Sequence, residues 1–121
     1  MEISIPKSVK SIDDSAFYGC ISLTSIMIPE EVTRIESFAF GDCSNLISIT
    51  LSSNVASVGE LAFFGCGNLK SVEFCDAEGW YVTANFDDEE GVEIASADLS
   101  DPAKAAELLK DTYSGYYWKK H

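Results

Sequence analysis

Histidine is almost absent from this chain, because the one histidine among 121 residues is the last residue, His121. Nucleophilic catalysis through a Ser-His-Asp or Cys-His arrangement needs a positioned histidine, and a chain terminus is seldom well ordered. A glycine-rich phosphate loop is also missing after every predicted strand, and most acidic residues gather in the C-terminal part of the chain. The sequence therefore predicts a protein that is not an enzyme and needs no cofactor.

Basic residues are scarce as well, since 8 lysines and arginines face 20 acidic residues and give a formal net charge of −12. A chain of this charge is repelled by phosphate backbones and by anionic membrane surfaces. Apolar runs are short, and none approaches the roughly 20 residues that a membrane-spanning helix needs. We therefore expect no nucleic-acid partner and no membrane insertion by these residues.

A signal peptide is also missing from the start of the sequence. Met1 leads directly into an alternating segment, without a basic region followed by an apolar one. A piece taken from a secreted protein would begin in the same way, so this absence leaves the location of the protein open.

A five-residue motif occurs three times at a constant spacing of 23 residues. It reads AFYGC at Ala16–Cys20, AFGDC at Ala39–Cys43 and AFFGC at Ala62–Cys66. Apolar residues on both sides keep the same spacing, so rows of 23 residues follow the pattern LxxIxIPxxVxxIxxxAFxxCxx. The recurring sets are Ile3/Ile26/Ile49/Val72, Ile5/Ile28/Leu51/Phe74, Val9/Val32/Val55, Ile12/Ile35/Val58 and Leu23/Leu46/Leu69. A fixed period of this length indicates a structural repeat.

Each row divides into parts with different spacings. Apolar residues alternate over Ile26–Ile28, as in a short strand with one buried face. Val32, Ile35 and Ala39 then follow at steps of three and four, which is typical of a helix or a tight turn. A row thus predicts one strand, a corner and one short helix or turn. No row can bury its apolar residues alone, whereas rows stacked side by side form one continuous core.

The row LTSIMIPEEVTRIESFAFGDC at Leu23–Cys43, with its two copies, resembles the BspA-type (Treponema-type) leucine-rich repeat of bacterial surface proteins. The resemblance covers residues 1–75, and the third row departs from it at Ser52, where the first two rows have Pro6 and Pro29. It implies an α/β solenoid, a short array of 23-residue leucine-rich repeats with parallel strands on the concave side. It also implies an extracellular or cell-surface location and a role in adhesion or recognition.

The three cysteines of the motif could be ligands, disulfide partners or core residues. Cys20, Cys43 and Cys66 share one position of the row, so they are expected to stack at the strand spacing of about 4.8 Å. That spacing does not exclude a disulfide, but stacked side chains point the same way, and a line of three does not converge as zinc ligands do. Buried thiols acting as small apolar side chains are the favoured interpretation. Cys75 lies outside this line and can be partly exposed.

Residues 76–121 contain no further copy of the row. A stack of repeats needs an atypical terminal element to cover its apolar end, and this segment can supply one. Trp80–Val82 and Val92–Ile94 each predict a short strand, and the acidic residues between them predict a turn. The sequence thus predicts repeats over residues 1–75 and a cap over residues 76–121.

A helix is predicted near residues 101–114. Ser100 or Asp101 can act as its N-cap, Pro102 suits its first turn, and Gly115 can end it. The ending DPAKAAELLKDTYSGYYWKK also resembles the tail that follows the last repeat of BspA-type proteins. This second resemblance implies a C-terminal αβ cap.

Two features of this segment have alternative interpretations. Its aromatic residues, whose rings could stack on sugars or seal the end of the stack, are Trp80, Tyr81, Tyr116, Tyr117 and Trp118. Large rings bury the most area, which favours the seal. The acidic run Asp87–Glu90 could bind calcium, but calcium needs six to eight oxygens around one point. Consecutive acids without a distal glutamate favour a solvated turn.

The outward positions of the predicted sheet give the candidate binding face. They alternate with the buried positions and are Ser25, Met27, Ser48, Thr50, Ser71 and Glu73. Repeat proteins usually bind with this sheet, so we expect a non-catalytic interaction or adhesion module for a protein or host-surface ligand. The alternative is a structural spacer and end-cap that supports a binding region upstream. An exposed apolar patch on the face would favour recognition, and a uniformly polar face would favour the spacer.

The first row has no neighbour on one side, because Ile3 and Ile5 already occupy strand positions. An open strand edge with apolar residues beside it favours association with another chain. The sequence therefore predicts either further repeats upstream or self-association of this chain through residues 1–20.

Overall fold

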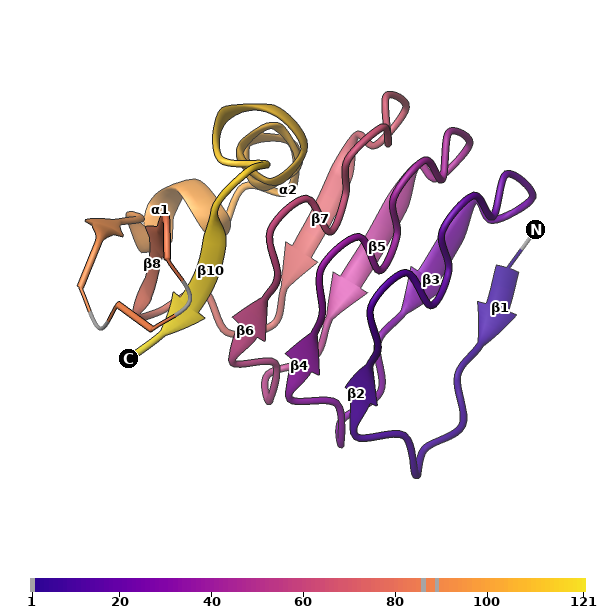
Figure 1. Ribbon diagram of the computed structural model, residues 1–121, viewed down its shortest axis with the longest axis horizontal. Coiled ribbons are helices and arrows are strands. Elements are labelled where there is room, and N and C mark those ends of the chain that lie inside the picture. The colour runs from indigo at the N-terminus through magenta and orange to yellow at the C-terminus, as the bar shows by residue number, and fades with distance from the viewer. Residues whose placement is uncertain (1, 86, 89) are drawn as a thin grey trace.

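The computed structural model describes residues 2–85, 87–88 and 90–121. Figure 1 shows successive loops of chain lying side by side, with helices and further strands gathered at the end opposite the N-terminus. Each row of the repeat contains two strands: β1 (Glu2–Ser4) and β2 (Ser11–Ile12), β3 (Ser25–Met27) and β4 (Arg34–Ile35), then β5 (Ser48–Leu51) and β6 (Ser57–Val58). A further strand, β7 (Ser71–Phe74), follows the third row.

The strands of the rows pair in two parallel arrangements. One sheet has the order β1-β3-β5-β7, and its register places Ile26 beside Ile49 and Ile49 beside Val72. The other contains β2, β4 and β6, which are also parallel neighbours. The strand pairing therefore follows the 23-residue period, and the predicted parallel strands are confirmed.

The chain after each corner forms a second strand and a turn, so the turn alternative is correct and the helix alternative is wrong. The spacing of three between Val32 and Ile35 does not reflect a helix, because Ile35 lies in the two-residue strand β4. Two positions of the motif region have positive φ in every row, and they are Ser15/Phe38/Leu61 and Gly19/Asp42/Gly65. A right-handed helix cannot pass through left-handed residues, which explains why the helical spacing produces tight turns here.

Hydrogen bonds and stacked rings join these turns from row to row. The amide of Phe17 donates to the carbonyl of Ala39, and that of Phe40 donates to Ala62, both at 2.8 Å. The rings of Phe17 and Phe40 stack 5.2 Å apart and those of Phe40 and Phe63 stack 5.5 Å apart, nearly parallel in both pairs. The turns are thus as regularly spaced as the strands.

The motif cysteines form the expected line, and all four cysteines are free thiols. Cys43 and Cys66 are buried, Cys20 is half-buried and Cys75 is exposed. The thiols do more than fill space: Cys43 Sγ lies 3.1 Å from the carbonyl of Phe17, and Cys66 Sγ lies 3.0 Å from that of Phe40. Each of these thiols donates a hydrogen bond to the preceding row.

The C-terminal segment contains strands and helices that run across this repeat pattern. Its elements are β8 (Trp80–Thr83), β9 (Val92–Glu93), α1 (Ser96–Leu99), α2 (Pro102–Glu107), the π-helical turn η1 (Leu108–Thr112) and β10 (Tyr117–Lys120). Asp101 is the N-cap of α2 and accepts hydrogen bonds from the amides of Ala103 and Lys104. α2 packs against β7, so it lies on the last strand of the repeats.

Strand β10 links the C-terminal segment to the third row, and sequence reasoning missed it. It pairs antiparallel with β6 on one side and with β8 on the other, which gives the sheet order β2-β4-β6-β10-β8-β9. Trp118 on β10 is buried against Phe74, Trp80 and Tyr113. The strands β1 and β2 are the outer strands at the other end of the two sheets. Self-association through residues 1–20 stays a prediction.

Candidate functional site

The six predicted site residues lie on the outward face of three neighbouring strands. Ser25 on β3, Ser48 on β5 and Ser71 on β7 are register partners. The second set of register partners along the same strands is Met27, Thr50 and Glu73. Parallel pairing with a 23-residue offset places side chains of equal row position side by side, and this explains why both sets align.

Four of these residues line one open depression of about 810 Å³. They are Ser25, Met27, Ser48 and Thr50, whereas Ser71 and Glu73 lie outside it, further along the sheet on β7. Met27 is an exposed large apolar side chain, at 70% of its full accessibility. The face is therefore not uniformly polar, because it offers one apolar anchor among hydroxyl groups.

Sequence reasoning missed the rim of this depression. Ile5 and Lys7 come from the first row, and Pro29, Glu30 and Glu31 come from the corner that follows β3. The corner positions could have been found, because they follow the IP pair of the row directly, beside the outward strand positions. The rim thus adds one cation and two carboxylates to a floor of hydroxyl groups and a thioether.

The chemistry of this depression suits binding. Hydroxyl groups donate and accept hydrogen bonds, and an exposed methionine adapts its shape to an apolar partner. Its lining contains neither histidine nor cysteine. The described residues also leave no buried side-chain nitrogen or oxygen without a hydrogen-bond partner.

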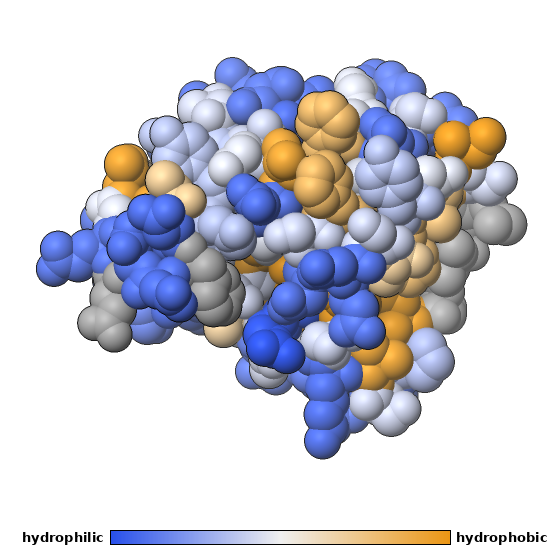
Figure 2. Space-filling view, in the orientation of Figure 1, coloured by the Kyte–Doolittle hydropathy of each residue, from blue (hydrophilic) through white to orange (hydrophobic). Residues whose placement is uncertain are grey.

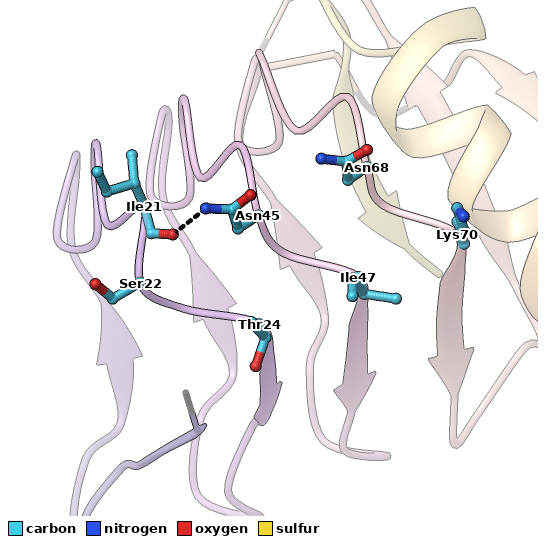
Figure 3. Close-up of a pocket in the computed structure, with 7 residues that line it drawn as sticks. All are labelled: Ile21, Ser22, Thr24, Asn45, Ile47, Asn68 and Lys70. Atoms are coloured by element: carbon cyan, nitrogen blue, oxygen red, sulfur yellow. Dashed lines mark hydrogen bonds between the residues drawn. The ribbon is translucent and has the colours of Figure 1, made fainter.

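A second depression, of about 610 Å³, lies where the chain enters the strands of the first sheet (Figure 3). Its lining residues are Ile21, Ser22, Thr24, Asn45, Ile47, Asn68 and Lys70. The amide of Asn45 donates to the carbonyl of Ile21, and the amide of Asn68 donates to that of Ser44, both at 2.7 Å. These asparagines hold neighbouring rows together, and their spacing of 23 residues was a signal that sequence reasoning missed.

The acidic run Asp87–Glu90 gives no calcium site that can be described. Glu89 lies outside the described residues, so the calcium hypothesis for the run as a whole also lies outside them. Asp88 accepts hydrogen bonds through Oδ2 from Thr83 and Asn85, both at 3.2 Å. Within the described part of the chain, no group of three or more acidic, histidine or cysteine side chains could hold a metal ion.

The predicted aromatic set is divided between the core and the surface. Trp80, Tyr81 and Trp118 are buried, Tyr117 is half-buried and Tyr116 is exposed. The indole of Trp80 donates to the carbonyl of Asp76 at 3.0 Å, and that of Trp118 donates to Tyr113 at 3.2 Å. The polar atoms of both indoles are therefore paired with backbone carbonyls of the protein itself. These rings form packing contacts and no open platform for a sugar.

Comparison with known families identifies the repeat. A model described as a BspA-type leucine-rich repeat region of six copies matches residues 1–82. The chain belongs to the BspA-type leucine-rich-repeat family. This match covers more than the 75 residues over which the row pattern was read, because it extends into β8. The family assignment agrees with the parallel strand pairing and makes this chain a protein-interaction repeat.

One solved structure is reported as similar to this BspA-type chain. It is a crystal structure of a leucine-rich repeat protein from Bacteroides ovatus, with 23% identity and a TM-score of 0.36. The similarity covers 60% of the present chain and 39% of that protein, so the chain spans well under half of its length. The comparison with curated proteins finds no match. Among the described residues, no helix has the length and apolar character to cross a bilayer.

Proposed function

We propose that this chain is a non-catalytic recognition module of a surface or secreted BspA-type protein, and that it binds a protein ligand through the outward face of β3 and β5. The observation that carries the proposal is the exposed Met27 in a depression lined by Ser25, Ser48 and Thr50. An apolar side chain that is already exposed and surrounded by hydrogen-bonding groups can be buried by a partner at little desolvation cost. Ser71 and Glu73 extend the same face toward the C-terminal segment.

The proposal includes an arrangement of the chain. Residues 1–75 form a short solenoid with the β1-β3-β5-β7 sheet on its concave side, and residues 76–121 form its αβ cap. The pairing of β10 with β6 and the packing of α2 on β7 support the cap, because both elements cover the third row. The surface or secreted location rests on the family and is part of the proposal.

A cell-binding assay tests this function. Fluorescent protein is titrated onto intact bacterial and mammalian cells, with and without prior protease treatment of the cell surface. Saturable binding that protease removes is expected for a protein ligand. Met27→Glu should weaken it about tenfold or more, because a carboxylate buried in the contact without a partner is costly.

Val92→Glu is the matched control, since Val92 is 52% exposed on β9 in the other sheet. It introduces the same charge and should leave binding unchanged. Equal binding by both variants would exclude the sheet face as the contact surface. Binding that survives protease treatment would exclude a protein ligand.

The second candidate is a spacer and end-cap that supports a binding region elsewhere in a longer protein. Five of the six predicted face residues are serine, threonine or glutamate, and this composition favours it. A spacer should show no saturable binding in the assay above. It should nevertheless stabilise additional BspA-type repeats when they are joined to its N-terminal end, which a rise in their unfolding midpoint would measure.

A further inference from the structure

We propose that a second surface, formed by the turns of the repeat, docks a protein segment rich in arginine or lysine. This aromatic turn surface consists of the rings of Tyr18, Phe38 and Phe64, with the carboxylate of Asp42 against Tyr18. It lies on the turns that follow β2, β4 and β6, away from the sheet face assigned above. A basic segment can place a cation against the rings and pair it with a neighbouring carboxylate.

The rings form a continuous line across the three rows. The ring centre of Phe38 lies 6.3 Å from that of Tyr18 and 6.3 Å from that of Phe64. Tyr18 is 49% exposed and Phe64 is 48% exposed, while Phe38 between them is half-buried. Figure 2 shows apolar side chains gathered amid hydrophilic ones over the turns in the middle of this face. Single exposed rings are ordinary, but a contiguous line of them marks an interaction surface.

The backbone holds this line in place at a cost. Phe38 has a φ of +56°, in the left-handed region that bulky side chains seldom adopt. The ring of Tyr18 lies over Gly41, where an added Cβ would approach the ring to 2.7 Å, so a larger residue at position 41 would displace the ring. Ser15 and Leu61 have the same positive φ at the equivalent position, so this conformation belongs to the turn of every row. In the second row it places the ring of Phe38 between those of Tyr18 and Phe64.

A carboxylate in contact with the ring line, that of Asp42, gives the surface its charge preference. The hydroxyl of Tyr18 donates to Oδ2 of Asp42 at 2.8 Å, and this bond, followed by the charge of Asp42, raises the pKa of Tyr18. Partial burial and the nearby carboxylates of Glu60 and Asp14 raise the pKa of Tyr117 on β10. A guanidinium is attracted by ring faces and by carboxylates together, so arginine fits best.

Two other occupants fit this surface less well. A second copy of the chain carries the same net charge of −12 and the same carboxylates, so two such surfaces repel each other. A sugar stacks on a flat ring face, whereas neighbouring rings here are inclined by 57° and 77° and share no plane. Cations are not restricted to one plane, because they can lie between inclined rings.

Fluorescence anisotropy with a labelled synthetic peptide of alternating arginine and glycine tests the proposal on the full chain. Phe64→Ser should weaken binding about fivefold, a change of the size that exposed cation–π contacts allow. The matched control is Tyr116→Ser, because Tyr116 is 38% exposed in the C-terminal segment and its replacement also leaves the net charge unchanged. The control should bind like the parent, and circular dichroism checks that both variants fold.

A second pair of variants tests the carboxylates. Asp42→Asn should weaken peptide binding more than Glu107→Gln, although both remove one negative charge and both residues lie outside the apolar core. Met27→Ser should bind the peptide like the parent, which separates this surface from the sheet face. Equal weakening by Asp42→Asn and Glu107→Gln, or no effect of Phe64→Ser, would show that net charge alone attracts the peptide. If light scattering shows that the parent chain is a dimer and that Phe64→Ser is a monomer, a second copy of the chain is the occupant. Each of these outcomes would overturn the proposal.

Discussion

The repeat rows and the C-terminal segment bury their aromatic side chains in different ways. In the rows, Phe17, Phe40 and Phe63 stack face to face with interplanar angles of 1° and 5°. In the C-terminal segment, Trp80 meets Phe74 at 77° and Trp118 at 62°, in edge-to-face contacts. The first arrangement repeats one contact, whereas the second combines contacts that occur once each.

This difference separates a part of the molecule to which further rows can be added from a part that ends the stack of rows. Parallel rows with equal side chains can be extended by another row, because every row offers the same ring, the same carbonyl groups and the same strand edge. The C-terminal segment stops this extension by pairing β10 antiparallel with β6 and by placing Trp118 against Phe74. Damage to a unique contact should therefore have larger effects than damage to an outer copy of a repeated one.

The largest effect is expected from Trp118→Ala. Trp118 is 1% exposed, touches three aromatic rings and donates its indole proton to the carbonyl of Tyr113, so its removal leaves a large cavity and costs one hydrogen bond. The free energy of unfolding should fall by about 5 kcal/mol, the upper end for a buried aromatic residue. Urea denaturation measures this loss. Tyr116→Ala, at an exposed neighbour, should change it by less than about 1 kcal/mol, and equal losses would contradict the role of Trp118.

The next effect compares two positions of the ring stack. Phe40 is fully buried between Phe17 and Phe63, whereas Phe17 is half-buried in the first row. Phe40→Ala should lower the free energy of unfolding by about 3–4 kcal/mol, and Phe17→Ala by about half of that, since less area is lost. Thermal and urea unfolding of both variants measure the difference. A Phe17→Ala loss as large as that of Phe40→Ala would show that the rows do not behave as inner and outer copies.

A smaller effect is expected from the thiol line. Cys66→Ala removes the hydrogen bond to the carbonyl of Phe40 and should cost about 1–2 kcal/mol of unfolding free energy. Interaction with Cys43 and burial raise the pKa of the Cys66 thiol, so its reactive thiolate form is suppressed. Alkylation of the native protein should therefore label Cys75 first, Cys20 next, and Cys43 and Cys66 last. Rapid labelling of Cys66, followed by mass spectrometry, would contradict the buried thiol line.

The smallest effect concerns the ion pair between Lys120 on β10 and Asp76. The two groups lie 2.6 Å apart, and the hydrogen bond from Lys120, with one from the amide of Glu78, lowers the pKa of Asp76. The pKa of Asp76 is about 3.9 in the unfolded chain and lower in the folded protein, so the ion pair stabilises the fold at pH values above about 3.9. This contribution disappears as the pH falls through the pKa of the folded state.

Because the carboxylate of Asp76 is 38% exposed, the contribution should stay below about 1 kcal/mol. The test compares the unfolding free energy of the parent and of Asp76→Asn at pH 7 and near pH 2. The parent should be the more stable of the two at pH 7, and this advantage should be absent at the acidic pH. An advantage of the parent that persists at low pH would show that the ion pair is not its source.

The period of the sequence was sufficient to predict the parallel register, because apolar residues of equal row position must meet when rows stack. It could not distinguish a helix from a turn around Phe38 and Asp42, since both structures use steps of three and four. The deciding feature is positive φ at non-glycine residues, which residue type alone does not reveal. Alternation along a strand fixes which side chains share a face, so the sequence alone could place Ser25, Met27, Ser48 and Thr50 on one side of the sheet, while their role in binding stays a prediction.

Features that depend on pairing between distant segments were not predictable in the same way. Strand β10 carries the aromatic residues Tyr117 and Trp118, but its partner β6 lies nearly 60 residues earlier in the chain and has only two residues. The aromatic turn surface was missed because Tyr18 and Phe64 share one position of the row, whereas the second row has Gly41 there and supplies Phe38 from another position. The line of rings therefore does not follow one position of the row, and a comparison of equal row positions does not find it.

Photo-crosslinking from position 27 tests the recognition function most directly. A benzophenone amino acid replaces Met27 in one protein and Val92 in a matched control, and each protein is irradiated on the cells that bind the parent. The proposed function predicts one dominant protein crosslinked from position 27, reduced by an excess of unlabelled parent and missing from the control. Equal crosslinking from both positions would contradict recognition through the outward face of β3 and β5. Crosslinking from position 27 that an excess of unlabelled parent does not reduce would contradict it as well.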